Sequence, residues 1–282
     1  MPVGTLYIVA TPIGNLEDMT FRAVRILREV DLIAAEDTRH SRKLLSHFGI
    51  SRPLTSYFDH NKELKGGYVL EKLREGLSVA LVSDAGTPCI SDPGCQLVRD
   101  AAMAGVRVVP IPGPSAGITA LSASGLLSSS FAFEGFLPNR AGKRREKLAS
   151  LKDEQRALVF YESPNRLSAT LADMKTILGN REAVVARELT KIYEEFARGT
   201  LSTVAAQFAG EKVRGEVVVI VAPPGPPGKV GIAQASALLQ TYLSSSGLTL
   251  KDAVKRAAGE TGLPRSEVYA EALRLKDGLT GT

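Results

Sequence analysis

Carboxylates and cations directly after predicted strands are the residues of this chain best suited to chemistry. They are Glu36, Asp37 and Arg39 after 31–35, Glu162 and Arg166 after 157–161, and Glu188 and Lys191 after 183–186. Active sites of open α/β sheets lie at the carboxyl ends of strands, so these groups could exchange a proton with a bound ligand. We expect Asp37, or Glu188 together with Lys191, to take part in catalysis. A helix cap or an ion pair remains the alternative for each carboxylate.

Three loops rich in Gly and Pro also follow predicted strands. They are 9–15 (VATPIGN), 83–94 (SDAGTPCISDPG) and 110–116 (PIPGPSA). Glycine adopts backbone angles that other residues resist, and proline stiffens a loop. Ordinary tight turns are the alternative for one loop alone, but the three together favour a pocket in which a ligand approaches backbone. None contains GxGxxG or GxxxxGK[ST], so the usual fingerprints of dinucleotide and triphosphate binding are missing.

The elements that must position these residues alternate between strand and helix. The predicted strands are 5–10, 31–35, 79–82, 106–110, 130–134, 157–161, 183–186 and 217–221, and the predicted helices are 20–29, 41–48, 61–75, 93–104, 141–150, 165–178 and 203–209. This alternation is typical of α/β sheets covered by helices. We predict two α/β domains, 1–112 and 113–222, with the ligand cleft between them.

A small helical tail is expected at 229–282. Residues 222–228 (APPGPPG) predict a stiff linker, and three helical patterns follow at 232–245, 249–260 and 265–276. Two short helices around a Gly-containing turn resemble a helix-turn-helix. A helical cap packed on the body is the alternative.

The composition is that of an ordinary globular protein. The 282 residues are 44% hydrophobic and 23% charged, with a net charge of +5 that is compatible with a polyanionic partner. No apolar run reaches membrane-spanning length and no secretory signal is visible, so we expect a cytoplasmic protein without a membrane partner. Cys89 and Cys95, with three scattered histidines, make a poor metal site. We expect free thiols and no metal.

An ordered set of motifs resembles the tetrapyrrole-methylase superfamily. The motifs are 9–20 (VATPIGNLEDMT), 35–39 (AEDTR), 83–88 (SDAGTP), 112–116 (PGPSA), 133–138 (FEGFLP), 160–166 (FYESPNR), 186–191 (ARELTK) and 215–218 (GEVV). Within the superfamily they are most similar to the branch that methylates a cytidine 2′-hydroxyl of small-subunit (16S) ribosomal RNA. The superfamily's Gly-Asp-Pro loop is replaced here by 84–88, and the first loop has fewer glycines. These departures disfavour a corrin or sirohaem substrate.

The resemblance implies a fold of two α/β domains with S-adenosylmethionine in the cleft between them, a homodimer, and a decoding-region cytidine as target. The residues expected to bind the cofactor are Pro12, Gly14, Asp84, Ala85, Gly86, Thr87, Ile90, Ser115, Ala116 and Tyr161. We expect Gly86 to let the backbone come close to the ligand. Ser115 and Ala116 are expected to open a helix whose first amides can bind a carboxylate. A simple N-cap is the alternative for Ser115.

Methylation of a ribose hydroxyl needs a base, a cation that lowers the hydroxyl's pKa, or positioning alone. RNA also requires cationic contacts to phosphate. The predicted RNA-binding residues are Arg39, Arg42, Arg140, Lys143, Arg144, Arg145 and Arg166. Solvated helix faces are the alternative. Tyr57 and Phe58, beside His60 and Asn61, could stack on a base or belong to the core.

Two other functions remain open from the sequence. One is methylation of a tetrapyrrole by the same fold, and the other is non-catalytic RNA binding by a protein that senses the cofactor. The basic segment 140–147 and the helical tail disfavour the first. Methyl transfer from labelled cofactor to isolated ribosomal subunits would distinguish all three.

Overall fold

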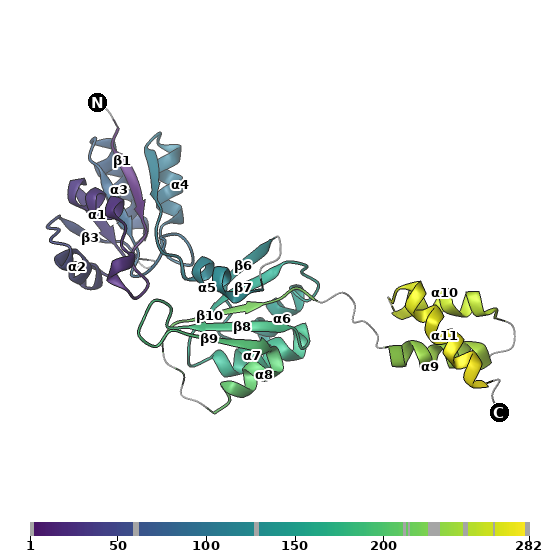
Figure 1. Cartoon of the computed structure of the whole chain (residues 1–282). Coiled ribbons are helices and arrows are strands. Elements are labelled where there is room, and N and C mark those ends of the chain that lie inside the picture. The colour runs from purple at the N-terminus through teal and green to yellow at the C-terminus, as the bar shows by residue number, and fades with distance from the viewer. Residues whose placement is uncertain are drawn as a thin grey trace. The chain divides into compact units, whose positions relative to one another are not determined.

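The computed structural model describes residues 3–58, 62–126, 130–210, 213, 215–224, 232–244, 248–261 and 263–279. Contacts divide the chain into two compact units, Met1–Pro223 and Pro224–Thr282. The first unit contains two five-stranded sheets and the second is helical (Figure 1). No helix in the described part of the chain is long and apolar enough to cross a membrane.

The first sheet is wholly parallel, with strand order β3-β2-β4-β1-β5. Its elements are β1 (Thr5–Val9), α1 (Phe21–Glu29), β2 (Leu32–Ala35), α2 (Thr38–His47), β3 (Leu54–Ser56), α3 (Lys62–Arg74), β4 (Val79–Val82), α4 (Cys95–Met103) and β5 (Arg107–Ile111), with a 3₁₀ turn η1 at Leu16–Asp18. Parallel strands buried on both faces are continuously apolar. In β4, Ala80 and Val82 pack in the core under α1 and α2, whereas Val79 and Leu81 pack under α3 and α4.

The second sheet is mixed, with strand order β6-β7-β10-β8-β9. Its elements are α5 (Ala116–Ser124), β6 (Phe131–Phe136), α6 (Ala141–Ser150), β7 (Ala157–Glu162), α7 (Leu167–Leu178), β8 (Glu182–Arg187), β9 (Glu195–Thr200), α8 (Leu201–Gln207) and β10 (Val217–Val221). Only β6 and β7 pair in parallel. Helices α6, α7 and α8 share a core with one face, and α5 packs on the other. The expected domain boundary at 112/113 falls between β5 and α5 and stays a prediction.

The sequence missed two edge strands, β3 and β9. Strand β3 has only three residues, and β9 (EFARGT) exposes the charged side chains of Glu195 at its start and Arg198 near its centre. Neither carries the alternation that identifies a half-buried strand. Helix α2 begins at Thr38, earlier than expected, because the side chain of Asp37 accepts a hydrogen bond from the Arg39 amide and caps it.

The second unit consists of α9 (Ile232–Ser244), α10 (Leu250–Thr261) and α11 (Arg265–Leu279). Its own apolar core includes Leu239, Ala257, Leu263 and Val268. Thr249 caps α10 by accepting a hydrogen bond from the Asp252 amide. Most of the predicted linker, 225–228, lies outside the described residues.

Candidate active site

The three Gly/Pro loops meet at one cavity of about 370 Å³ in the first unit. Reciprocal backbone hydrogen bonds of 2.9 and 3.0 Å join Thr11 in the first loop to Gly86 in the second. The Thr87 hydroxyl donates to the Pro114 carbonyl at 3.1 Å and joins the second loop to the third. These hydrogen bonds join the three loops to one another at the cavity wall.

The cavity is lined by residues of the loops that follow strands of the first sheet and by residues in and around the second sheet. They are Ile13, Glu36, Asp84, Ala85, Gly86, Thr87, Ile90, Ser91, Asp92, Ser115, Ala116, Phe136, Tyr161, Glu162, Ser163, Pro164, Leu189, Gly215, Glu216, Val217 and Val218. Among the predicted cofactor residues, this lining brings together Asp84, Ala85, Gly86, Thr87, Ile90, Ser115, Ala116 and Tyr161. Pro12 and Gly14 flank the lining residue Ile13 and are not themselves in the lining.

Gly86 has a φ of +77°, a region that side chains disfavour. A Cβ built there would lie 3.5 Å from the Ile13 side chain, which is ordinary van der Waals contact. A Cβ at this position would therefore not clash with the rest of the described chain, and the closeness of the Gly86 backbone to the ligand stays a prediction. The glycine is required by the backbone conformation of the loop.

Carboxylates dominate the polar lining of the cavity. Five of the lining residues are acidic, namely Glu36, Asp84, Asp92, Glu162 and Glu216, and no Lys, Arg or His is among the lining residues that the structure describes. Burial, followed by the negative charges of Glu36, Asp84 and Glu216, raises the pKa of Asp92 to about 6, although a hydrogen bond with Ser83 opposes the rise. Such crowding of like charges favours a ligand that carries positive charge.

Hydrogen bonds between the second loop and the residues after β2 hold part of this cluster in place. The Asp37 amide donates to Asp84 Oδ1 at 3.0 Å, and the Asp84 amide donates to Glu36 Oε2 at 3.3 Å. Sequence reasoning did not single out Asp92 or Glu216 as site residues. Both lie in stretches that it had marked, the second Gly/Pro loop and the 215–218 motif, but their convergence depends on the tertiary fold.

The N-terminus of α5 forms another part of the wall. Ser115 occupies the N-cap position without a capping hydrogen bond from its side chain, so the simple-cap alternative is wrong. The Gly117 amide donates to the Tyr161 hydroxyl at 3.1 Å, so this amide of the first turn is already bound. Burial raises the pKa of Tyr161 and keeps its phenol neutral. Tyr161 thus anchors the first turn of α5 against β7.

Lys191 and Glu188 form a tight pair beside the cavity. Lys191 Nζ lies 2.8 Å from Glu188 Oε1 and 3.7 Å from Glu216 Oε2. The pairing with Lys191 lowers the pKa of Glu188. Burial acts to lower the pKa of Lys191, but its contacts with Glu188 and Glu216 outweigh burial and raise it. Both groups therefore stay ionised at neutral pH, and Lys191 cannot accept a proton.

Asp37 has the structural role that was the alternative to catalysis, as a helix cap and a member of an ion pair. Besides capping α2, it makes an ion pair of 2.9 Å with Arg39. The hydrogen bonds from Arg39 lower the pKa of Asp37 to about 2. A carboxylate held this way is a weak base, and Asp37 is not among the described residues that line the cavity.

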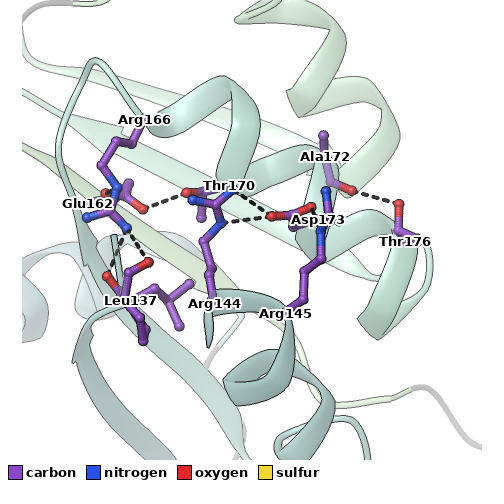
Figure 2. Close-up of polar contacts among 10 residues, drawn as sticks. Leu137, Arg144, Arg145, Glu162, Arg166, Thr170, Ala172, Asp173 and Thr176 are labelled. Atoms are coloured by element: carbon purple, nitrogen blue, oxygen red, sulfur yellow. Dashed lines mark hydrogen bonds and ion pairs between the residues drawn. The ribbon is translucent and has the colours of Figure 1, made fainter. Parts of the chain in front are cut away.

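The basic segment at 140–147 is only partly available to RNA. Figure 2 shows Arg144 and Arg145 converging on Asp173 of α7. Arg144 Nη2 and Arg145 Nε lie 2.6 and 2.8 Å from its carboxylate, and the Arg144 side chain is only 7% exposed. Burial acts to raise the pKa of Asp173, but the two guanidinium groups outweigh burial and hold this pKa below its usual range. The prediction that Arg144 binds RNA is therefore wrong, because its guanidinium is buried in an ion pair with Asp173 and is not exposed to a ligand.

Arg166 also holds structure together. It donates to the Leu137 carbonyl at 2.8 Å, to the Pro138 carbonyl at 3.2 Å and to the Asn139 side chain, and it lies 3.4 Å from buried Glu162 (Figure 2). Glu162 in turn accepts a 2.6 Å hydrogen bond from Thr170. Arg166 thus clamps the β6–α6 loop, which does not fit its predicted role as a phosphate contact.

The other predicted RNA-binding side chains are at the surface. Arg39, Arg42, Arg140 and Lys143 are exposed, and Arg145 is 63% exposed despite its bond to Asp173. Tyr57 is buried in the first sheet's core, so it cannot stack on RNA, and Phe58 is partly exposed. His60 and Asn61 lie outside the described residues. Cys89 and Cys95 are free thiols, and no cluster suited to a metal occurs in the described part of the chain.

The two-sheet fold and its loop-lined cavity define a methylase of the tetrapyrrole-methylase type. The model of Tetrapyrrole (Corrin/Porphyrin) Methylases matches residues 5–205, and that of the RsmI C-terminal HTH domain matches 231–276. More specifically, the chain belongs to the ribosomal RNA small subunit methyltransferase I family.

Curated relatives carry that name over nearly their whole length. The relative from Halalkalibacterium halodurans is 49% identical, with 94% of this chain and 93% of the relative covered. The one from Xylella fastidiosa is 51% identical, with 94% and 98% covered. The match to the C-terminal HTH model supports the helix-turn-helix interpretation of the tail.

Solved structures share the fold of the first unit. A cobalt precorrin-4 methyltransferase superimposes with a TM-score of 0.60 at 18% identity, over 77% of this chain and 94% of its own. A diphthine synthase gives 0.62 at 14% identity, over 78% and 90%. A uroporphyrin-III C-methyltransferase from Thermus thermophilus, solved with S-adenosylhomocysteine, gives 0.54 at 22% identity, over 78% and 97%. At these identities the likeness concerns the fold alone.

Proposed function

We propose that this chain is an S-adenosylmethionine-dependent methyltransferase that modifies a cytidine 2′-hydroxyl in the decoding region of small-subunit ribosomal RNA. The curated relatives are named for methylation of small-subunit ribosomal RNA. The observation that carries the cofactor assignment is the cavity lined by five carboxylates and, among its described lining, no cationic side chain. S-adenosylmethionine carries positive charge on its sulfonium and its amino group and negative charge on its carboxylate, so its net positive charge complements this lining.

When bound, S-adenosylmethionine supplies an electrophilic methyl group. The chain's own task is to bind it, orient it and exclude water. We assign the binding to the residues predicted from the sequence that line the cavity, together with Asp92 and Glu216. The loop containing Gly86 lets backbone groups face the ligand, and Ser115 presents a hydroxyl at the N-terminus of α5.

We assign Lys191 the role of stabilising negative charge that develops on the ribose oxygen. Its ammonium remains protonated because Glu188 and Glu216 raise its pKa, and it stands beside the lining residue Leu189. Glu188 holds the ammonium in place at 2.8 Å. Asp37 is not part of this catalytic proposal, because it caps α2 and pairs with Arg39. A preorganised cation of this kind stabilises a transition state without itself taking the proton.

Phosphate contacts are proposed for Arg140, Lys143 and Arg145 on or beside α6. Arg39 and Arg42 on α2 are proposed as a second set. All five are exposed, and neither Arg140 nor Lys143 has an ion-pair partner among the described residues. Exposed cations contribute to RNA affinity through counterion release. We also propose a homodimer and a location in the cytoplasm, where ribosomal RNA is found.

The deciding experiment is methyl transfer from labelled S-adenosylmethionine to isolated small subunits that lack the modification, followed by mapping of the labelled nucleotide. Label on a cytidine ribose is expected. Label accepted by a tetrapyrrole and not by subunits would support the rival enzyme. Subunit binding without any transfer would support the non-catalytic RNA-binding protein.

A further inference from the structure

The loop between β8 and β9 presents two large apolar side chains to solvent. Ile192 is 94% exposed and Tyr193 is 75% exposed. Single exposed apolar residues are common on protein surfaces. Two consecutive ones at the tip of a loop are a feature that the packing of the first unit does not explain.

This loop is held in one conformation by its own contacts. The Lys191 amide donates to the Glu188 carbonyl at 3.0 Å, and the Glu194 amide donates to the Lys191 carbonyl at 3.1 Å. The Thr190 amide donates to Glu194 Oε2 at 2.7 Å. Glu188 and Thr190 have φ values of 51° and 66°, which are unfavourable for residues other than glycine. Such strain persists only where surrounding contacts enforce it, and it concentrates at functional sites.

The same contacts tie the tip to the cavity. Leu189 is buried and lines the cavity wall. The Asn15 amide in the first Gly/Pro loop donates to the Thr190 hydroxyl at 3.1 Å. The stem of Lys191 packs so closely on Gly14 that a Cβ there would lie 2.5 Å from Lys191 Cγ. Tyr193 is four residues beyond Leu189, so its backbone is within about 14 Å of the wall.

The size and chemistry of the tip indicate what it binds. Two side chains can bury far less surface than the roughly 800 Å² per partner that a stable protein interface buries. An aromatic ring beside a branched aliphatic side chain does match the face of an unpaired nucleobase, and base–aromatic stacking is worth about 1–3 kcal/mol per base. A base stacked on this tip would lie near the proposed methylation site.

We propose that Tyr193, supported by Ile192, stacks on an unpaired base next to the ribose that is methylated. The inference rests on the proposed RNA substrate and adds a substrate contact to that site. The rigid loop orders the platform in advance, so little entropy is lost when RNA binds. Lys191, in the same loop, is thereby fixed relative to the RNA strand.

The test compares Tyr193→Ala, Ile192→Ala and Tyr193→Phe in the full chain. Met103→Ala serves as the matched control, because Met103 is 82% exposed at the C-terminal end of α4. Affinity for small subunits is measured over a range of salt concentrations, and affinity for S-adenosylmethionine is measured separately. Tyr193→Ala should weaken subunit binding by about tenfold, Ile192→Ala by less, and Tyr193→Phe and Met103→Ala by less than about twofold.

The salt dependence separates stacking from charge. Stacking releases no counterions, so Tyr193→Ala should leave the slope of log affinity against log salt unchanged. Cofactor affinity should also be unchanged. The proposal is overturned if Tyr193→Ala binds subunits within twofold of wild type while wild type methylates them normally, or if the variant changes the oligomeric state instead. If wild type neither binds nor methylates subunits, the proposed function fails together with it.

Discussion

Replacing Asp92 with Asn should make the protein more stable above pH 6 while weakening its affinity for S-adenosylmethionine. Burial and the charges of Glu36, Asp84 and Glu216 raise the pKa of Asp92 to about 6. Because this folded-state value lies above that of the unfolded chain, the folded protein loses stability as pH rises from about 4 to about 6. Above pH 6 the loss of stability caused by ionisation of Asp92 is complete. An asparagine, which has the same shape but is neutral, does not cause this loss.

The magnitude follows from the size of the pKa rise. Each pKa unit corresponds to about 1.4 kcal/mol, so a rise from about 4 to about 6 is equivalent to roughly 3 kcal/mol. Asp92 is half-buried and screened by solvent, which reduces the expected gain to about 1–2 kcal/mol. At roughly 2–4 °C per kcal/mol for a unit of this size, the melting temperature at pH 8 should rise by about 2–8 °C.

The same change removes one of the cavity's negative charges. At an effective dielectric constant of about 20, unit charges several ångströms apart interact by about 2–3 kcal/mol, and screening reduces this. A loss of about 1.4 kcal/mol, or roughly tenfold in affinity for S-adenosylmethionine, is therefore expected. S-adenosylhomocysteine lacks the sulfonium charge and should lose less.

Thermal unfolding between pH 5 and pH 9 and calorimetric titration with both ligands measure these effects. Glu71→Gln is the control, because it removes an exposed carboxylate on α3 away from the cavity lining. It should change neither quantity appreciably. A melting temperature of Asp92→Asn that equals wild type at pH 8, or equal losses of affinity for the two ligands, would refute the reasoning.

Three further predictions concern cations. Lys191→Met should slow single-turnover methylation by at least about tenfold, or roughly 1.4 kcal/mol of barrier, with cofactor affinity within twofold of wild type; an unchanged rate would make the lysine structural. Arg140→Glu combined with Lys143→Glu should weaken subunit binding and flatten its salt dependence, as binding at several salt concentrations would show. Arg144→Met should destabilise the first unit by about 3–5 kcal/mol in denaturant unfolding by leaving Asp173 buried without its main partner, and stability within 1 kcal/mol of wild type would contradict this.

The sequence could predict the elements and the loops because their signals are local. Strand β4 is four apolar residues that end in a Gly/Pro loop, and α6 matches its expected range at both ends. The burial of Arg144 could also have been predicted in part. Arg144 precedes Leu148 by four residues and so shares the buried face of α6. The number of cations in 140–147 alone predicts a surface position for Arg144, because it ignores the helical periodicity.

The acidic character of the cavity could not be read in this way. Glu36, Asp92 and Glu216 are separated by long stretches of sequence, and only the packing of both sheets places them at one cavity. Each carboxylate alone resembles a turn residue or a helix cap. Their effect is electrostatic and depends on how close they lie to one another. Burial and the charges of its neighbours raise the pKa of Asp92, even though Lys191 lies 3.7 Å from Glu216.

This clustering of carboxylates at one cavity supports a ligand site more strongly than any one motif does. Ion pairs elsewhere in the first unit show the opposite pattern, since Asp173 is buried between two arginines and its pKa is lowered. A fold that gained nothing from the cluster would be more stable with amides in place of its carboxylates. Strong pKa perturbation in a cavity is characteristic of functional sites. A cation bound from solution relieves the repulsion only while it is present, so the cluster couples the stability of the first unit to occupancy by a positively charged ligand.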